Sequence, residues 1–325
     1  MRSGTTETSP ACKMSSTFTS DVSDEELDLF FQEWVTQSKH LKILVTGQVG
    51  SGKSALINSL LRTTDEIPGG QAAKEGDSAA SVTSKVGIYA VNKNGVEMVL
   101  YDTPGLLDPD INKLDVPTLS KIQKETGGEI DLLLVCKRMG SRLDSGDIRV
   151  MQQITEYMGE SVWKNAAYIL TFANEVRPAR RRGAKLPTEE ETIDDFARKE
   201  KEMEELLREY LHKEGHVTAD IANEVPVVPA GYDDPSLPGR SDWYNVLWLT
   251  VCSRIKASSQ PALLKVVHIP QELRTVVPEN QQKSVTGSHS KVSELLLFLR
   301  NLTMQVPAIG CKFREWVSNS KHKKD

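Results

Sequence analysis

The stretch Gly-Gln-Val-Gly-Ser-Gly-Lys-Ser at residues 47–54 decides how this chain folds. An apolar run at residues 41–46 precedes it and helix-forming residues follow it, so the order strand, glycine-rich turn, helix is expected. Glycine adopts the backbone angles that direct several N–H groups at one anion, and a helix N-terminus adds its positive dipole end at the same place. The stretch therefore predicts a phosphate-binding loop.

The side chains of this loop have separate expected roles. The Lys53 ammonium is expected to reach the β- and γ-phosphates of a nucleotide, and the Ser54 hydroxyl is expected to bind Mg²⁺. Backbone amides of the loop are expected to contact the phosphate oxygens. The predicted phosphate-binding residues are Gln48, Val49, Gly50, Ser51, Gly52, Lys53, Ser54 and Ala55.

A second stretch, Asp102-Thr103-Pro104-Gly105, ends another predicted strand. An Asp in this place can hold Mg²⁺ through a water molecule, and the Gly105 N–H can meet the γ-phosphate. Loss of that phosphate would then release the loop that follows, at residues 106–113. The two stretches together predict an order–disorder switch controlled by a nucleotide.

A Ser or Thr that completes the Mg²⁺ coordination only in the triphosphate state is expected between these two stretches. Thr83 is the first choice because it stands at the end of a polar loop, just before a predicted strand; Ser81 and Ser84 are the alternatives. The predicted groups at the reacting phosphate are therefore Lys53, Thr83 and Gly105. The predicted metal site consists of Ser54, Thr83 and Asp102.

The order of these motifs resembles that of the immune-associated nucleotide-binding (GIMAP-type) GTPases, which are related to the septins and to the GTPases of the chloroplast protein-import receptor. The resemblance covers residues 40–255. It is carried by residues 47–54, Ser81-Val82-Thr83, residues 102–105 and Ile169-Leu170-Thr171-Phe172. It implies a G domain that uses GTP or GDP with Mg²⁺ and that forms a homodimer or oligomer across the nucleotide face.

The residues for base recognition depart from the common GTPase pattern. Most GTPases carry Asn-Lys-x-Asp after the strand at residues 166–171, whereas this chain has Thr171-Phe172-Ala173-Asn174-Glu175. The resemblance implies that Asn174 accepts a hydrogen bond from guanine, and that Glu175 supplies a carboxylate if the turn shifts by one residue. It also implies that a backbone N–H of Ala230 or Gly231 meets the guanine oxygen.

Catalysis is expected to be slow or to need help. Leu106 and Leu107 stand where Ras-type GTPases place a Gln that orients the attacking water. A partner chain is the implied source of help, and Arg142 is a candidate contact, although a solvated loop arginine is the favoured interpretation. Two other functions stay open: a P-loop ATPase or small-molecule kinase, and a nucleotide-binding scaffold without significant turnover.

Strands that alternate with helices predict an α/β fold of the P-loop NTPase class. We expect a mostly parallel central sheet with one antiparallel edge strand, helices on both faces, and a C-terminal helical extension. Strands are expected at residues 41–46, 86–91, 96–101, 130–136, 166–171 and 224–229. Helices are expected at residues 53–61, 117–126, 144–158, 188–211 and 242–255.

The predicted G domain comprises residues 40–256. A disordered tail at residues 1–22 and a helix at residues 23–39 precede it, and a helical and linker extension at residues 257–325 follows.

Composition narrows the possible partners and the compartment. The net charge of −5 and a pI near 5.8 argue against nucleic acid, which demands a basic surface. The 4 scattered cysteines favour reduced thiols, the N-terminus lacks a signal-peptide pattern, and no apolar run approaches the length of a membrane span. A cytoplasmic protein is expected. The basic stretch at residues 177–185 is most simply a solvated loop, and the alternatives are contact with an acidic lipid surface, a partner or RNA.

Overall fold

A central strand, β1 (His40–Gly47), leads into the glycine-rich loop in the computed structural model of the chain. The structure describes residues 40–62, 87–93, 96–103, 115–176, 186–232, 236–240, 243–256, 258–259 and 262–263. These residues all fall within one compact unit, Val35–Thr275. The predicted tail and helix at residues 1–39, and the extension beyond residue 263, lie outside the described part.

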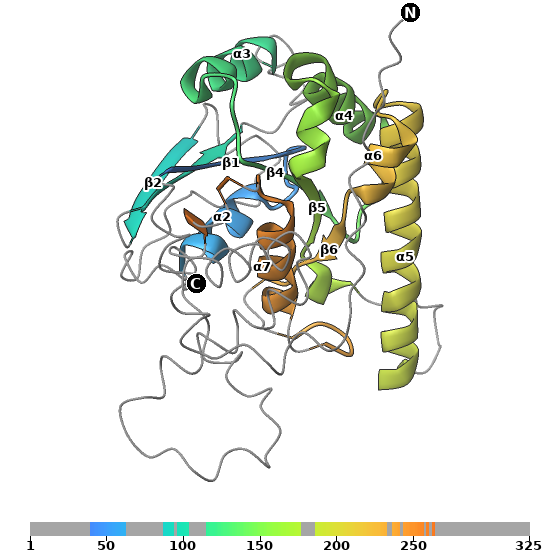
Figure 1. Ribbon diagram of the computed structural model, residues 1–325. Helices are drawn as coiled ribbons and strands as arrows, with labels where there is room; N and C mark the ends of the chain where they lie inside the picture. The colour runs from blue at the N-terminus through green and yellow to red at the C-terminus, as the bar shows by residue number, and fades with distance from the viewer. Residues whose placement is uncertain are drawn as a thin grey trace, which may run out of the picture. The chain divides into compact units, whose positions relative to one another are not determined.

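Six strands form one sheet in the order β2-β3-β1-β4-β5-β6 (Figure 1). The strands beside β1 are β2 (Gly87–Lys93), β3 (Val96–Asp102), β4 (Leu132–Arg138), β5 (Ala166–Thr171) and β6 (Val227–Pro229). β2 pairs antiparallel with β3, and the remaining described pairs run parallel. The predicted mostly parallel sheet with one antiparallel edge strand is confirmed.

Burial along the strands follows their place in the sheet. All residues of β5 are buried, and β4 is buried up to its last residue, Arg138. Such continuous apolar runs are typical of strands that are covered on both faces. The edge strand β2 is different, because Ile88 leaves 44% of its surface exposed.

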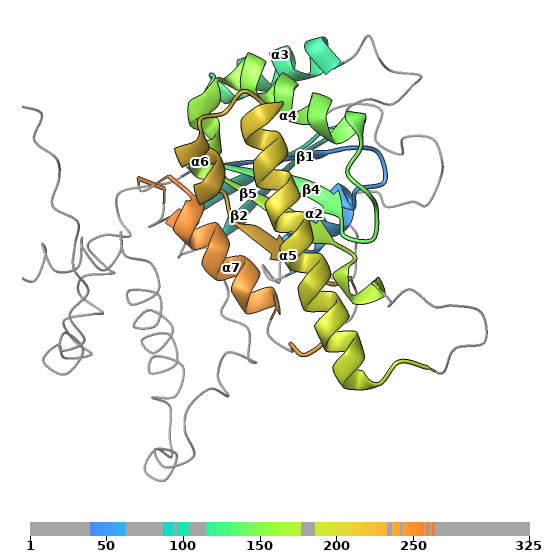
Figure 2. The ribbon, with the colours of Figure 1, turned by 90° about the vertical axis from the view of Figure 1, so that its right-hand side faces the viewer.

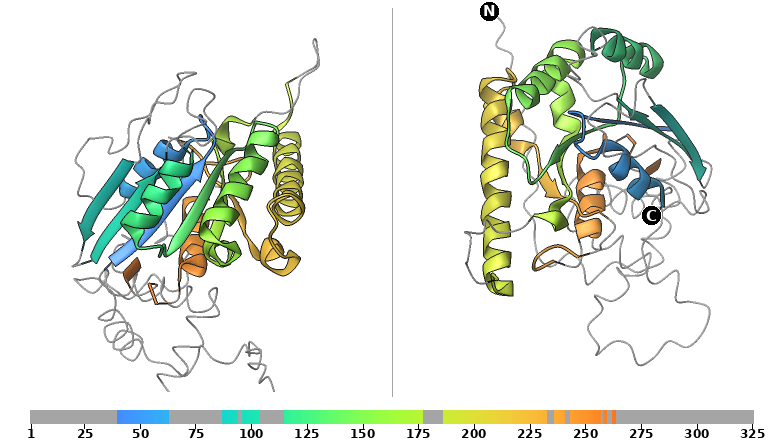
Figure 3. Two further views of the ribbon diagram at one scale, coloured as in Figure 1. Left: turned by 90° about the horizontal axis from the view of Figure 1, so that it is seen from above. Right: turned by 180° about the vertical axis from the view of Figure 1, so that it is seen from behind.

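Helices cover both faces of the sheet. In Figure 1, α3 and α4 lie above the strands while α2 and α7 lie below them, and the view from above in Figure 3 shows α3 and α4 in front of the sheet. Figure 2 shows the long helix α5 in the foreground. The helices are α2 (Lys53–Arg62), α3 (Asp115–Thr126), α4 (Ser145–Met158), α5 (Glu189–Lys213), α6 (Ala219–Glu224) and α7 (Trp243–Arg254).

Side-chain caps explain where two of these helices begin. The Asp144 carboxylate accepts hydrogen bonds from the amides of Gly146 and Asp147 at the start of α4. At the start of α5, the Thr188 hydroxyl accepts from the amide of Glu191, and the Glu191 carboxylate accepts from the amide of Thr188. This reciprocal capping box satisfies amides that a helix leaves unpaired.

The structure corrects the strand that was expected at residues 224–229. β6 spans only Val227–Pro229, because Glu224 ends the short helix α6, which the sequence did not reveal. The Val225 amide donates to the Ala222 carbonyl and closes that helix, so no strand can start before it. Among the described residues, no helix combines the length and the apolar character that a membrane span requires.

Candidate functional site

The carboxyl ends of the parallel strands meet at one edge of the sheet, which is where α/β folds bind ligands. β1 ends in the glycine-rich loop, β3 ends at Asp102 and β4 ends at Arg138. β5 ends at Thr171, and β6 leads into Ala230. The topology therefore brings the two predicted phosphate motifs and the two predicted base loops to the same side.

Two glycines of the loop are required by their surroundings. Gly47 has φ +145°, and a Cβ atom there would lie 2.4 Å from the carbonyl oxygen of Cys136 on β4. Gly52 has φ +81°, and a Cβ atom there would lie 2.7 Å from the Phe172 ring and 3.0 Å from Thr171. Only glycine fits either place, so the loop passes close to the end of β4 and to the base loop after β5.

Lys53 opens helix α2 and turns its ammonium back onto the loop. Its Nζ donates to the carbonyl of Gln48 at 2.9 Å and to that of Gly47 at 3.3 Å. The side chain is buried, and this burial lowers the pKa of the ammonium, while the negative charge of Asp102 partly offsets the effect. The structure thus places a buried cation inside the loop that is predicted to hold phosphate.

Ser54 and Asp102 meet beside this cation. The Ser54 hydroxyl donates to Asp102 Oδ2 at 3.0 Å, and the Asp102 side chain is fully buried. Burial raises the pKa of Asp102 to about 6, although Lys53 and the Ser54 hydrogen bond act in the opposite direction. Its other oxygen, Oδ1, has no hydrogen-bond partner among the described residues. A buried carboxylate oxygen with unmet capacity beside a hydroxyl fits a hydrated Mg²⁺, which prefers oxygen ligands.

The end of β5 is tied to the phosphate loop. The Thr171 hydroxyl donates to the carbonyl of Ser51 at 2.7 Å. The Ser51 hydroxyl itself is buried without a hydrogen-bond partner in the described part of the chain. Buried polar groups are rarely left unpaired. After Asp102 Oδ1, this hydroxyl is therefore a second buried group at the site that can still form a hydrogen bond to a ligand.

The two predicted base loops bond to each other. The Ala173 amide donates to the Ala230 carbonyl at 3.0 Å. The side chain of Asn174 donates through Nδ2 to the carbonyl of Tyr232 at 2.8 Å and accepts from the amide of Tyr232 at 2.9 Å. Asn174 therefore joins the loop after β5 to the loop after β6, where Gly231 also lies.

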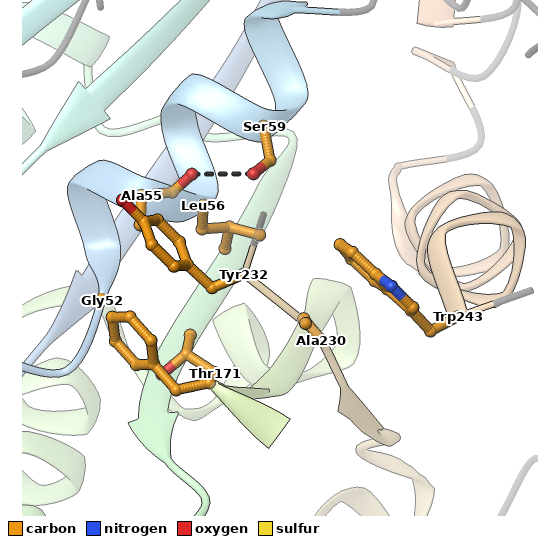
Figure 4. A pocket seen from close by; sticks show the side chains of 10 residues that line it. Gly52, Ala55, Leu56, Ser59, Thr171, Ala230, Tyr232 and Trp243 are labelled. Carbon is orange, nitrogen blue, oxygen red and sulfur yellow. Dashed lines mark hydrogen bonds between the residues drawn. The ribbon is translucent and has the colours of Figure 1, made fainter. Parts of the chain in front are cut away.

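A pocket lies between these loops and helix α2. The rings of Phe172 and Tyr232 have centroids 5.3 Å apart. In Figure 4 the Tyr232 ring lies near Ala55, while Trp243 of α7 stands across the pocket. The pocket is lined by Gly52, Ala55, Leu56, Ser59, Thr171, Phe172, Ala230, Gly231, Tyr232 and Trp243.

Several predicted residues lie outside the described residues, and their roles stay predictions: Ser81, Thr83, Ser84, Gly105, Leu106 and Leu107. Of the rest, the structure brings Lys53, Ser54 and Asp102 into one cluster. Glu175 instead accepts a hydrogen bond from the Arg138 guanidinium at 2.6 Å.

The sequence did not reveal how the loop after β4 is held. Gln48 of the phosphate loop donates through Nε2 to the Asp144 carboxylate at 2.7 Å. Lys137 forms a buried ion pair with Asp147 at 2.6 Å and also donates to the Arg142 carbonyl at 2.7 Å. Of these features only the cap at Asp144 carries a local signal, as a polar residue directly before a helical pattern.

Proteins related in sequence match part of the chain. "GTP-binding protein A" of Dictyostelium discoideum is 33% identical over 138 residues, which is 42% of this chain and 29% of that protein. The chain thus spans less than a third of the length of this relative.

Solved structures match over a larger share. Toc33 from Arabidopsis thaliana, in complex with GDP and Mg²⁺, aligns over 73% of this chain and 90% of its own length, with TM-score 0.52 and 20% identity. A second matching structure comes from work on the chloroplast translocon components atToc33 and psToc159, for which dimerisation is stated to be important for the GTPase activity. It aligns over 70% of this chain and 88% of its own length, with TM-score 0.51 and 21% identity.

At this level of identity the structural likeness shows the fold, which is that of P-loop GTPases. The family model that matches residues 41–213 is that of the AIG1 family. More than half of the chain is covered, and the protein belongs to the AIG1 family.

Proposed function

We propose that this protein binds GTP and GDP together with Mg²⁺, hydrolyses GTP slowly, and acts as a nucleotide-dependent switch or assembly module. The observation that carries this proposal is the cluster of Lys53, Ser54 and Asp102 at the glycine-rich loop, with a buried carboxylate oxygen that has unmet capacity. The name of the Dictyostelium relative and the GDP and Mg²⁺ in the Toc33 structure support it.

The phosphates are proposed to be held by the amides of residues 48–54 and by Lys53. The ammonium has only to leave two carbonyl oxygens of its own loop to reach them. Ser54 and Thr83 are proposed to hold Mg²⁺, with Asp102 acting through water. The ion would neutralise the charge that develops on the phosphate oxygens.

Guanine is proposed to bind in the pocket beside Gly52 and Tyr232, next to the backbone of Gly231. The Ala230 amide already donates to the Leu170 carbonyl at 2.8 Å, so Gly231 is the proposed amide donor to the base. Asn174 is proposed as the polar group that fixes the base loops against each other and that contacts the base. The aromatic rings in the lining supply the apolar surface on which a flat base can stack.

Hydrolysis is proposed to be an in-line attack of water on the γ-phosphate, with Lys53 stabilising the developing charge and the Gly105 amide contacting that phosphate. Leu106 cannot orient the water, so a second copy of the chain is proposed to assist across the nucleotide face. Arg142 is the candidate contact because its side chain is exposed while its carbonyl is fixed by Lys137.

The finer features of identity and setting are also proposals. We propose a cytoplasmic protein whose nearer relatives are the immune-associated GTPases and whose more distant ones are the septins. The negative net charge supports a function without nucleic acid. If the protein contacts a membrane surface, the basic residues at 177–185 are the proposed contact.

Phosphate release from GTP, measured over a range of protein concentrations, tests this proposal. The rate per molecule is expected to rise with concentration, because a dimer completes the site. Arg142→Ala should keep the low rate at every concentration without changing GDP affinity, whereas Arg198→Ala, an exposed arginine on α5, should behave as wild type. A flat, near-zero rate in the wild type would instead favour a scaffold without turnover.

A further inference from the structure

Arg138, the last residue of β4, contacts both ends of the loop that follows β5. Its guanidinium carbon lies 4.3 Å from the centroid of the Phe172 ring. Its Nη2 donates to Glu175 Oε2 at 2.6 Å. One planar cation therefore stacks on the first residue of the loop and pairs with the last residue of the short helix at Ala173–Glu175.

Phe172 is a residue that needs such support. Its backbone adopts the left-handed conformation, with φ 54° and ψ 33°, which is unfavourable for a side chain of this size. A non-glycine residue in this conformation persists only when its surroundings hold it, and such residues gather at ligand sites. The Arg138 stacking contact is one interaction that holds it.

The position of the Phe172 ring matters to both halves of the site. The ring lies so close to Gly52 that a Cβ atom there would be 2.7 Å from it. It also packs beside Tyr232 and lines the pocket. A shift of this ring would therefore change the shape of the pocket next to the phosphate loop.

The guanidinium supports this ring from outside the pocket. Phe172 is among the pocket-lining residues, whereas Arg138 and Glu175 are not among those that the structure describes there. The side chains of Arg138 and Glu175 are 44% and 46% exposed, so water screens the ion pair and its attraction alone is weak. The ion pair with Glu175 instead serves to orient the Arg138 guanidinium over the Phe172 ring.

We propose that Arg138 is a positioning residue for base binding, which holds Phe172 as a wall of the base pocket and uses Glu175 as its anchor. This inference rests on the proposed binding of a guanine nucleotide. It also gives Glu175 the role of an anchor for Arg138 in place of the role of a base acceptor.

The test is calorimetric titration, with Mg²⁺ present, of GDP, inosine diphosphate and inorganic tripolyphosphate into the full chain. Arg138→Ala should weaken GDP about tenfold, the effect of losing a stacked and paired guanidinium, and leave tripolyphosphate within about twofold. Arg138→Lys should fall between Arg138→Ala and wild type, because it keeps the charge and loses the planar stack. Arg198→Ala is the matched control and should change nothing.

Glu175→Gln separates the two roles of this carboxylate. Inosine diphosphate lacks the exocyclic amine that a carboxylate acceptor would recognise in guanine. If Glu175 is an anchor, Glu175→Gln weakens GDP and inosine diphosphate together, by about threefold. A change in the ratio of the two affinities would mean that Glu175 reads the base, and would overturn the proposal.

Other outcomes also decide. Unchanged or tighter GDP binding by Arg138→Ala would overturn the proposal, and so would a parallel loss of tripolyphosphate binding, which would mean general damage to the phosphate loop. A wild-type chain that binds neither GDP nor tripolyphosphate would overturn the proposed function itself. The two failures are therefore distinguishable.

Discussion

The site has a phosphate half, formed by residues 47–54 and Asp102, and a base half, formed by residues 172–175 and 230–232. The two halves differ in whether their polar groups already have hydrogen-bond partners. In the phosphate half, the Ser51 hydroxyl and one oxygen of Asp102 are buried without partners in the described part of the chain. In the base half, the Asn174 carboxamide already bonds to the backbone of Tyr232 at both ends. The first half holds buried polar groups with unmet capacity, although its Lys53 ammonium must leave two loop carbonyls. In the second half, the Asn174 carboxamide must exchange both of its contacts with Tyr232. We therefore expect the polyphosphate to supply most of the affinity and the base to supply selectivity.

Among the substitutions that test this difference between the halves, Lys53→Ala is expected to have the largest effect on nucleotide affinity. It removes the buried cation of the phosphate half, so GTP and GDP affinity should each fall about a hundredfold, as for a lost hydrogen bond to a charged group. Calorimetric titration measures this loss. Lys213→Ala, an exposed lysine on α5, is the matched control. Binding that stays within about tenfold of wild type would contradict the division between the halves.

Gly52→Ala tests where the two halves touch. An added methyl would meet Phe172 at 2.7 Å and Thr171 at 3.0 Å at a backbone φ of +81°. We expect a loss of about 2–3 kcal/mol in unfolding free energy, measured by urea titration. Gly50→Ala is the control, since its φ is +73° but nothing lies within 4 Å of the added methyl. Equal losses would show that backbone strain alone acts.

Asp102→Asn tests whether the buried, partly unpaired carboxylate of the phosphate half makes the stability of the protein depend on pH. The folded-state pKa of Asp102 is raised from 3.8 to about 6, so the wild type loses stability as pH rises through that value. Without nucleotide, the Asn variant should be more stable than wild type by about 1–3 kcal/mol at neutral pH, with the gap closing below about pH 4.

Urea unfolding at several pH values measures this gap, and Asp194→Asn, an exposed position on α5, is the control. Saturating GDP and Mg²⁺ should reverse the order at neutral pH, since only the wild type keeps the carboxylate that favours the ion. A gap that does not depend on pH would remove the buried carboxylate from the explanation.

Asn174→Ala should have the smallest effect, because it acts only on the base half. Loss of its two hydrogen bonds to Tyr232 should weaken GDP about fivefold and leave tripolyphosphate unchanged. Competition between GDP and ADP measures whether the preference for guanine falls in parallel. A larger loss for tripolyphosphate than for GDP would reverse the assignment of the two halves.

The phosphate half could be predicted from the sequence because its signals are local. Glycines, a lysine and a hydroxyl at fixed spacing after an apolar run identify the loop, and the continuous apolar runs identify β4 and β5. Element ends were less predictable, since tertiary contacts decide them. β4 starts after Asp131, whose carboxylate accepts the Lys42 amide at 2.7 Å and the Ser259 hydroxyl at 2.6 Å.

The base half could not be predicted in the same way, because its contacts join distant positions. Thr171 bonds to Ser51 across 120 positions, and Asn174 bonds to Tyr232 across 58. The left-handed backbone of Phe172 carries no local signal either, since only glycine and asparagine adopt it routinely. The roles of Phe172, Tyr232 and Arg138 emerge only from the folded arrangement.

The central claim is that the loop at residues 47–54 binds the phosphates of a guanine nucleotide. Calorimetric titration of GTP and of ATP into the purified chain, with Mg²⁺ present, tests it most directly. The account predicts that GTP binds at least about a hundredfold more tightly than ATP, and that Lys53→Ala abolishes most of that binding. ATP binding as tight as GTP binding, or no binding of either, would contradict it.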